Sequence, residues 1–529
     1  MRDFQRSGRS MVHGTRGMAA TSHPLATATA IEILRAGGNA VDAAIAACAV
    51  QGVVEPQSTG IGGDCFALYA PGGRVPPYAI NGSGRAPAAA SVDRFREQGI
   101  DAIDFESAHA VTVPGALGTW ERLLADHGTK GLDEVLQPAI RYAEEGFVVH
   151  SRVAHDWANA ADDKLHACEN ARAIYLPGGR APAAGTLHRL PALAETLRLI
   201  AKEGAAAFYK GAIADDIVAH LAAHGSLMTA DDLAGFEPQA VEPISANYRG
   251  YDIYECPPNG QGIIALLILN MLEGFELAGL DPLGPERLHL EAEATRLGYR
   301  DRAALIADPD AVTVPVDALL STQYADAMRR HIDPARAMPA ELPPGYPAHG
   351  DTVYLTVVDG EGNAISFINS LFASFGSGLC TSSGVMLQNR GASFVIDADH
   401  PNRIAGGKRP MHTIIPGMVG QGEHAVMPFG VMGGHFQACG HAHFLTNVID
   451  YGMDPQAALD CPRAFHFGGV MTLETTIAET TARRLAALGH DVAWAAVPHG
   501  GGQAIAIDRE TGVLTGGSDP RKDGCALGI

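Results

Sequence analysis

The stretch T-V-Y-L-T-V-V-D at residues 352–359 decides the fold, because β-branched and aromatic residues dominate it and favour an extended strand. The next four residues, G-E-G-N at 360–363, predict a tight turn. The segment A-I-S-F-I-N at 364–369 has the same β character and returns beside the first stretch. We therefore predict a β-hairpin here, followed by further strands at 384–388, 393–396, 413–419 and 425–431.

A proline-rich segment stands directly before this hairpin, from residue 334 to residue 351. Proline lacks a backbone donor and interrupts both helices and central strands, so the segment predicts an extended, solvated linker. Its turn and breaker residues are Pro334, Pro339, Pro343, Pro344, Pro347, Gly345 and Gly350.

The two sides of the linker differ in their patterns. Before it, helical periodicity dominates, and two short helices within 26–50 are separated by Gly37-Gly38-Asn39, with Asn39 as an N-cap. Further helices are predicted at 116–124, 136–145, 190–203, 213–223 and 285–307, and after the linker at 435–450 and 480–488. The fold class is therefore α+β. Because the later part has too few helices to cover its own sheet, helices from 26–330 must cover it.

Composition excludes several classes of protein. The 529 residues carry 38 Lys+Arg against 59 Asp+Glu, a net charge of −21 that opposes general binding to nucleic acids or anionic membranes. With 47% hydrophobic residues the chain can form a large core. No apolar stretch reaches the roughly 20 residues of a membrane span, and the N-terminus lacks an export signal's apolar region. The eight scattered cysteines indicate reduced thiols, so we expect a soluble, cytoplasmic protein.

Thr352 is a candidate nucleophile because it opens the strand that follows the linker. If the bond before it were cut, Thr352 would carry both a hydroxyl and an α-amine with a pKa of about 8, which can serve as its base. Gly433 and Gly434 stand between a predicted strand and a predicted helix, where backbone N–H groups can hold an oxyanion. Each feature also has a purely structural interpretation that is common when the feature is taken alone: Thr352 as the first residue of a strand, and Gly433-Gly434 as an ordinary turn.

Metal binding is a rival interpretation of the segment G-H-F-Q-A-C-G-H-A-H-F. His435 and Cys439 are four residues apart on the predicted helix, a spacing that could bind zinc. His441 and His443 face other directions, and no carboxylate or second cysteine pair completes the set. No phosphate-binding or dinucleotide-binding glycine motif occurs either. We predict neither a metal nor a cofactor.

Short motifs along almost the whole chain resemble one family, the γ-glutamyltransferases (glutathione hydrolases) among the N-terminal-nucleophile hydrolases. Their joint order over some 500 residues carries the resemblance. They are I-L-R-A-G-G-N-A-V-D-A-A (33–44), G-I-G-G-D-C-F (60–66), V-P-G-A-L-G-T-W (113–120), C-P-P-N-G-Q-G (256–262), D-R-A-A-L-I-A-D-P (301–309), G-K-R-P (407–410), M-G-G (432–434) and S-D-P-R (518–521).

This resemblance implies a four-layer αββα fold and a precursor that cuts itself before Thr352. The products would be a large chain, 1–351, and a small chain, 352–529, interleaved rather than forming separate domains. Thr352 matches the family's nucleophile, Gly433 and Gly434 match its oxyanion pair, and Ser370 matches a position beside the nucleophile's amine. The expected partners are a small-molecule amide substrate and the two chains of one precursor, with a homo-oligomer as a further option.

The substrate-binding positions depart from the family pattern. In N-G-S-G-R-A-P (81–87), serine stands where the family has its carboxylate-binding arginine, and Arg85 comes two residues later. In L-Q-N-R-G-A-S-F (387–394), serine replaces the acid that meets the substrate's α-amine, and an arginine stands three residues earlier. The candidate substrate-binding residues are Arg85, Arg390, Ser393, His412 and Thr413, the last two replacing paired serines, while Phe372 replaces a polar position.

These departures leave three alternatives. Family resemblance makes γ-glutamyl amides such as glutathione the default substrates. Loss of the acid and gain of Arg390 favour instead an acyl group that carries a carboxylate but no α-amine, as in oxamate amidohydrolase or glutaryl-cephalosporin acylases among the wider family. A third alternative is an unprocessed, non-catalytic family member. Arg390 could also serve in a structural ion pair.

Overall fold

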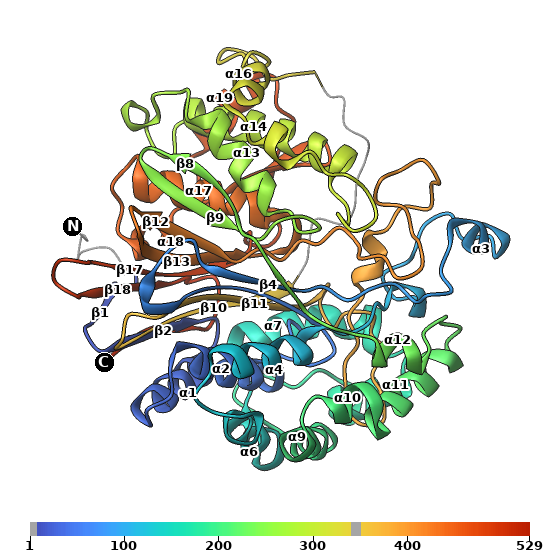
Figure 1. The fold of residues 1–529 in the computed structure, drawn as a ribbon. Helices are drawn as coiled ribbons and strands as arrows, with labels where there is room; N and C mark the ends of the chain where they lie inside the picture. Colours follow the sequence, from blue (N-terminus) through green and yellow to red (C-terminus); the bar gives the residue numbers. More distant parts are fainter. Residues whose placement is uncertain (1–7, 340–350) are drawn as a thin grey trace.

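The computed structural model describes residues 8–339 and 351–529. Two seven-stranded sheets lie face to face, and helices cover the outer face of each, so the order of layers is helix, sheet, sheet, helix (Figure 1). This confirms the predicted α+β, four-layer αββα fold. Most of the predicted linker, residues 340–350, lies outside the described residues.

The first sheet has the strand order β19-β2-β10-β11-β3-β4-β7 and the second has the order β1-β18-β17-β13-β12-β9-β8. Each sheet takes strands from both sides of residue 352, which interleaves the two parts of the chain. The bounds in the first sheet are β2 Gly17–Thr21, β3 Asp64–Ala70, β4 Tyr78–Gly82, β7 Gln239–Val241, β10 Asp351–Asp359, β11 Ala364–Phe372 and β19 Cys525–Gly528. Those in the second are β1 Val12–Gly14, β8 Ile244–Tyr248, β9 Tyr251–Glu255, β12 Gly417–Gln421, β13 His424–Met432, β17 Gly501–Ile507 and β18 Leu514–Ser518.

Helices from the first 330 residues cover the first sheet, as the sequence predicts. This layer includes α1 Pro24–Arg35, α2 Ala40–Val54, α4 Ala116–His127, α6 Gln137–Glu145 and α9 Pro191–Glu203 (Figure 1). The second sheet is covered by helices from both parts: α13 Gly262–Leu272, α14 Pro285–Leu305, α17 Gln437–Ile449 and α18 Pro455–Asp460. The helix α19, Glu479–Leu488, packs on α14.

The hairpin that decides the fold forms as predicted. β10 pairs antiparallel with β11 on one side and with β2 on the other, which places it in the middle of its sheet. Its inward side chains meet the second sheet in a dry core that includes Phe66, Leu68, Tyr354, Val358, Ile368, Met418 and Ile505. The predicted N-cap at Asn39 is also confirmed, since its side chain accepts hydrogen bonds from the N–H groups of Val41 and Asp42.

Two predicted strands, 384–388 and 393–396, are wrong. The first segment forms only an isolated bridge between Cys380 and Met386, and the second follows the short 3-10 helix Arg390–Ser393. Backbone donors here do not form a ladder: Gln388 N donates to Gly62 O at 3.0 Å in a distant segment, whereas Phe394 N donates to Gly391 O at 3.0 Å in a local turn. The strand predicted at 413–419 also begins later, at Gly417, which leaves Thr413 in a loop.

The eight cysteines are free thiols, and all except Cys525 are buried, as expected for reduced cysteines. No helix within the described ranges combines the length and the apolar character needed to cross a membrane.

Candidate active site

Thr352 lies near the start of β10 and is almost completely buried. Its Oγ1 lies 3.1 Å from the Oγ of Ser370 on the neighbouring strand β11. The β10–β11 ladder shifts register between Asp351 and Val353, so the candidate nucleophile stands at an irregularity in the sheet, as residues beside active sites often do. The structure thus brings two of the predicted catalytic residues into hydrogen-bond contact.

Ser370 is fixed from two sides. A Cβ atom on Gly63 would come within 2.3 Å of the Ser370 carbonyl oxygen, which explains a glycine in G-I-G-G-D-C-F. On the other side, Phe372 N donates to Ser370 Oγ at 2.8 Å. Phe372 reaches this position with a φ of 82°, a conformation that is strained for a bulky residue. The surrounding structure therefore holds a strained backbone that keeps Ser370 in place.

Arg390 belongs to the same cluster. Its guanidinium donates to Thr413 Oγ1 at 2.7 Å and to Ser370 Oγ at 3.4 Å. It lies over the ring of Phe372, 4.2 Å from the ring centroid, which is a favourable cation–π distance. Of the predicted substrate-binding residues, Arg390 is therefore linked to Thr352 through Ser370, and Thr413 is linked to it through Arg390 and Ser370.

The charge of Arg390 has no direct counter-ion in the described part of the chain. The side chain is fully buried, no salt bridge joins it to any carboxylate whose side chain the structure describes, and its Nε–H has no acceptor among those residues. Burial lowers the pKa of Arg390 to about 9, although the charge of Asp64 acts in the opposite direction. A buried cation with unused donors can bind an anion.

Gly433 and Gly434 form the turn between β13 and α17. Gly433 has a φ of 118°, and a Cβ there would lie 2.8 Å from Gly500 Cα, so the turn requires glycine. The short 3-10 helix Gly434–Phe436 starts here, and its first N–H groups have no intrahelical acceptor. Gln261 Nε2 donates to Gly434 O at 3.0 Å and to Thr413 O at 2.8 Å, which ties this turn to the Arg390 cluster.

His412 is placed differently from the prediction, because both of its ring nitrogens are already engaged. Nε2 lies 3.0 Å from Asp64 Oδ2, and Nδ1 accepts from Ile414 N at 3.3 Å. Burial, followed by the charge of Arg390, lowers the pKa of His412 to about 4, so the imidazole is neutral. A neutral ring with this pattern donates to Asp64 and has no donor left for a substrate.

The two remaining predicted residues lie at the edge of this cluster or outside it. Ser393 closes the 3-10 helix that begins at Arg390, and its buried Oγ has no hydrogen-bond partner in the described structure. Arg85 is partly exposed and points elsewhere: it donates to Gly407 O at 2.9 Å and pairs with Asp310 at 2.8 Å. Its contacts are therefore those of a surface ion pair.

Sequence reasoning missed two residues that organise the site, Asp64 and Gln261. Both lie in motifs that carry the family resemblance, G-I-G-G-D-C-F and C-P-P-N-G-Q-G. A buried polar residue within such a motif was the available signal. Neither motif shows which distant segments its side chain would join.

The four residues of the rival metal interpretation do not face one common point, because their contacts are divided among several partners. His441 Nδ1 lies 2.6 Å from Glu255, whereas His443 Nδ1 lies 3.1 Å from Glu291. Cys439 Sγ donates to Glu291 at 3.7 Å, and His435 Nδ1 lies 3.1 Å from Arg302. Cys439 and His443 thus share Glu291, whereas His441 and His435 belong to other buried hydrogen-bond networks.

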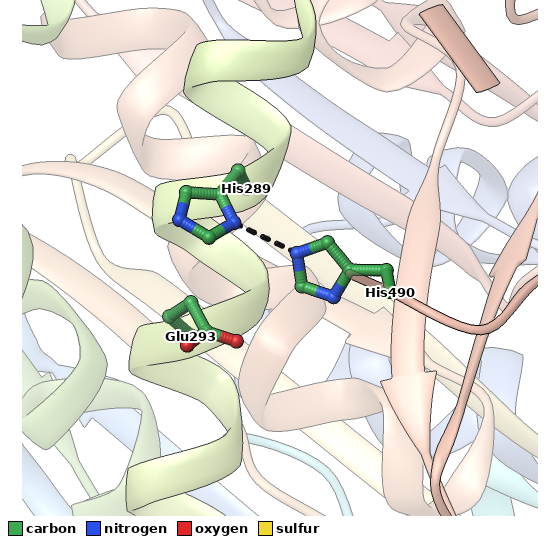
Figure 2. Close-up of side chains that lie close together, drawn as sticks. All are labelled: His289, Glu293 and His490. Atoms are coloured by element: carbon green, nitrogen blue, oxygen red, sulfur yellow. Dashed lines mark hydrogen bonds between the residues drawn. The ribbon is translucent and has the colours of Figure 1, made fainter. Parts of the chain in front are cut away.

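Another group, which the sequence did not suggest, has ligand atoms within 4.8 Å of one another: His289 and Glu293 on α14, and His490 after α19 (Figure 2). His289 Nδ1 lies 2.8 Å from His490 Nε2, and Arg296 pairs with Glu293 at 2.8 Å. Because Arg296 already balances the charge of Glu293, a divalent ion would leave two uncompensated charges in the interior. We interpret the group as a hydrogen-bonded joint between α14 and the C-terminal part of the chain.

Comparisons with known proteins agree with this geometry. The family described as gamma-glutamyltranspeptidase matches residues 26–529. The chain is 37% identical to the glutathione hydrolase-like YwrD proenzyme of Bacillus subtilis (strain 168), over 98% of this chain and 99% of the relative. It is 36% identical to the acylase ACY 1 proenzyme of Pseudomonas sp. (strain V22), over 98% and 94%.

A solved structure is similar over the same extent. The cephalosporin acylase from Bacillus halodurans matches with a TM-score of 0.93 and 40% identity, covering 100% of this chain and 99% of that one. Identity of this size over full length, together with the four layers described above, establishes common descent. The chain belongs to the γ-glutamyltranspeptidase family of self-processing N-terminal-nucleophile hydrolases.

Proposed function

We propose that this protein is an amidohydrolase that removes a short acyl group carrying a carboxylate and no α-amine. The observation that carries the proposal is Arg390, a fully buried cation with no salt bridge in the described chain, linked to Thr352 through Ser370. The resemblance to acylases supports it.

Maturation would precede this activity. Thr352 Oγ1 attacks the carbonyl carbon of residue 351, the peptide nitrogen leaves as the α-amine of Thr352, and water hydrolyses the resulting ester. This reaction would yield chains 1–351 and 352–529, consistent with relatives that are named proenzymes. The freed amine then serves as the base for the hydroxyl of its own residue.

In catalysis, Thr352 Oγ1 attacks the amide carbonyl while its α-amine accepts the hydroxyl proton. The N–H groups of Gly433 and Gly434 stabilise the oxyanion, and the protonated amine returns its proton to the leaving amine. Water then hydrolyses the acyl-threonine ester. Ser370, held by Phe372 N–H, keeps the hydroxyl in position.

The position of Arg390 limits the acyl group. Two successive hydrogen bonds, of 3.4 and 3.1 Å, separate its guanidinium from the Thr352 hydroxyl. A carboxylate bound by Arg390 would then stand a few atoms from the scissile carbonyl, which suits acyl chains of about two to five carbons. At the position where the family holds an ammonium group, this chain has Ser393 in place of an acid.

The second candidate is a γ-glutamyl amide hydrolase or transferase, favoured by the resemblance to a glutathione hydrolase-like protein. Its substrate carries an α-ammonium group that Arg390 would repel. Loss of one charge-assisted hydrogen bond costs about 1.5–3 kcal/mol, which corresponds to one to two decades in kcat/KM.

A pair of chromogenic anilides, glutaryl and γ-glutamyl, tests the proposal with wild type and Arg390→Ala. We expect the wild type to prefer the glutaryl anilide and Arg390→Ala to lose this preference. A hundredfold preference for the γ-glutamyl anilide that Arg390→Ala leaves unchanged would refute the proposed acyl group.

A denaturing gel tests maturation: the wild type should give two bands and Thr352→Ala one. Mass spectrometry should locate the cut before Thr352. A single wild-type band would instead indicate a non-catalytic member.

A further inference from the structure

Asp64, at the start of β3, is a fully buried carboxylate that four separate segments bind. Its Oδ1 accepts from Gly84 N at 3.3 Å, Gly115 N at 3.0 Å and Gln388 Nε2 at 2.9 Å. Its Oδ2 accepts from His412 Nε2 at 3.0 Å. None of these donors is a cation, so in the described chain no arginine or lysine forms a salt bridge with Asp64.

Two of these donors lie next to the residues of the proposed acyl pocket. Gln388 stands two residues before Arg390, and His412 stands directly before Thr413. Arg390 and Thr413 are themselves joined by a hydrogen bond of 2.7 Å. Asp64 therefore fixes the backbone beside Arg390 and beside Thr413, the two hydrogen-bonded residues of the proposed pocket.

Asp64 also faces Arg390 electrostatically without touching it. The buried guanidinium has lost its hydration, and the charge of Asp64 is the influence that favours its protonated form. A direct salt bridge would occupy the N–H groups that a substrate carboxylate needs. Separation of the two charges leaves those donors available while it limits the cost of burying a lone cation.

The other titratable groups that face this cluster do not supply the counter-charge. His412 and His435 are both buried, and burial together with nearby arginine charges lowers the pKa of each, so both rings are neutral at physiological pH. The α-amine that cleavage would create on Thr352 is a base of about pKa 8. Within the described cluster, Asp64 remains as the anion.

We propose that Asp64 is a positioning residue of the acyl pocket. Through its hydrogen bonds with Gln388 and His412 it holds Arg390 and Thr413 where they can bind a substrate carboxylate. Its charge balances that of the Arg390 guanidinium without using the guanidinium N–H groups. The inference rests on the proposed function. It assigns Asp64 no contact with the substrate.

Two variants separate the two roles of Asp64, which are to position the pocket residues and to balance the charge of Arg390. Asp64→Asn removes the charge and should raise KM for the glutaryl anilide about tenfold or more. It should also move the alkaline limb of kcat/KM down by about one pH unit, because Arg390 then loses its proton more readily. Gln388→Leu removes one donor but keeps the charge, so KM should rise while the alkaline limb stays where it is in wild type.

Asp42→Asn is the matched control. Asp42 is another fully buried aspartate that lacks a salt bridge in the described structure and accepts from a distant segment, through Thr129 N at 3.0 Å and Lys130 N at 3.1 Å. It lies at the start of α2, outside the pocket. Its substitution should lower thermal stability and leave KM and the pH limb of the processed enzyme unchanged.

The outcomes separate this inference from the proposed function. A wild type that does not cleave the glutaryl anilide refutes the proposed function. A wild type that cleaves it, with Asp64→Asn retaining both KM and the alkaline limb, refutes the role of Asp64. If Asp64→Asn fails to fold, Gln388→Leu decides the positioning role, because an unchanged KM in that variant contradicts it.

Discussion

Two buried arginines, Arg390 and Arg296, show how the same side chain serves different purposes in two regions. Arg296 on α14 pairs with Glu293 at 2.8 Å and donates to the carbonyl oxygens of Met338 and Pro339 at 2.8 and 2.7 Å. Among the described residues, Arg390 donates to two hydroxyl groups, those of Thr413 and Ser370. Both side chains are buried, with 6% and 0% exposure, so burial alone does not distinguish them.

The difference lies in what compensates the charge. In the Arg296 region the guanidinium has a counter-charge, Glu293, and two backbone carbonyl acceptors, although its Nε–H has no partner among the described residues. Arg390 has no salt bridge among the described residues, so only the more distant charge of Asp64 compensates it, and it lies beside the candidate nucleophile. A buried cation without a salt bridge therefore indicates a ligand, whereas a paired one indicates structure.

The largest expected effect is on stability, at Arg296. Arg296→Met leaves Glu293 buried without its counter-charge, which typically costs 3–5 kcal/mol. Urea unfolding in the Thr352→Ala background, where a single uncleaved chain is compared, measures it. Adding Glu293→Gln to Arg296→Met should recover part of the loss. A cost below about 1 kcal/mol would show that the joint does not depend on this pair.

The next effect is on catalysis, at Arg390. Arg390→Met should lower kcat/KM for the glutaryl anilide by roughly ten- to a hundredfold, because the substrate carboxylate loses its charge-assisted bonds. The urea midpoint should stay the same or rise, since an unpaired buried charge is replaced by an apolar chain. If Arg390→Met instead destabilises the protein as strongly as Arg296→Met, the two arginines share a structural role.

Much of this arrangement could be predicted from the sequence. The hairpin at 352–369, the helices on either side of the linker and the Thr352–Ser370 pair follow from local patterns and from the resemblance. The false strands at 384–388 and 393–396 show the limit of such patterns. Their residues have β character, but their backbone donors form local turns, as Phe394 N does with Gly391 O, or reach a distant loop, as Gln388 N does with Gly62 O.

The site was less predictable than the fold, because its contacts join distant segments. Sequence placed Arg85 and Arg390 on equal terms as carboxylate binders, yet Arg85 lies in a partly exposed ion pair with Asp310. It suggested His412 as a substrate contact, although Asp64 and Ile414 occupy both ring nitrogens. Whether an arginine has a partner depends on residues that no local motif contains.

A third, smaller effect concerns pH. Burial lowers the pKa of Arg390 to about 9, so the free enzyme should lose its cation as pH rises through this value. For wild type, kcat/KM with the glutaryl anilide should therefore fall above pH 9, while kcat changes less because a bound carboxylate favours the charged form. Arg390→Met should lack this fall. A wild-type profile that stays flat to pH 10.5 would contradict the assignment.

Through Arg390, a rise in pH has opposite effects on catalysis and on the stability of the folded protein. Since the pKa of Arg390 is lowered in the folded state, the unfolded chain binds the proton more tightly above pH 9, and stability from this group rises with pH until the unfolded side chain also loses its proton. Below pH 9 both states are protonated and the full cost of the buried charge remains. Loss of catalysis at alkaline pH should therefore not be accompanied by unfolding from this group.

The smallest effect is expected at His490, which contacts His289 on α14, near the Arg296–Glu293 pair. Its Nε2–H donates to His289 Nδ1, because His289 Nε2 must itself donate to the Asp333 carbonyl. Burial, then the neighbouring His289, lowers the pKa of His490 from 6.5 to about 3. The unfolded chain therefore binds this proton more readily, and stability from this group, complete above pH 6.5, is lost as pH falls toward 3.

His490→Gln can keep the donor, so its cost at pH 7 should stay within about 1 kcal/mol, while the decline in urea midpoint between pH 6 and 4 becomes less steep. The exposed His13 provides the control, since His13→Gln should leave this decline unchanged. If His490→Gln unfolds with the same pH dependence as wild type, the joint does not contribute to acid sensitivity, and its two histidines act only through packing.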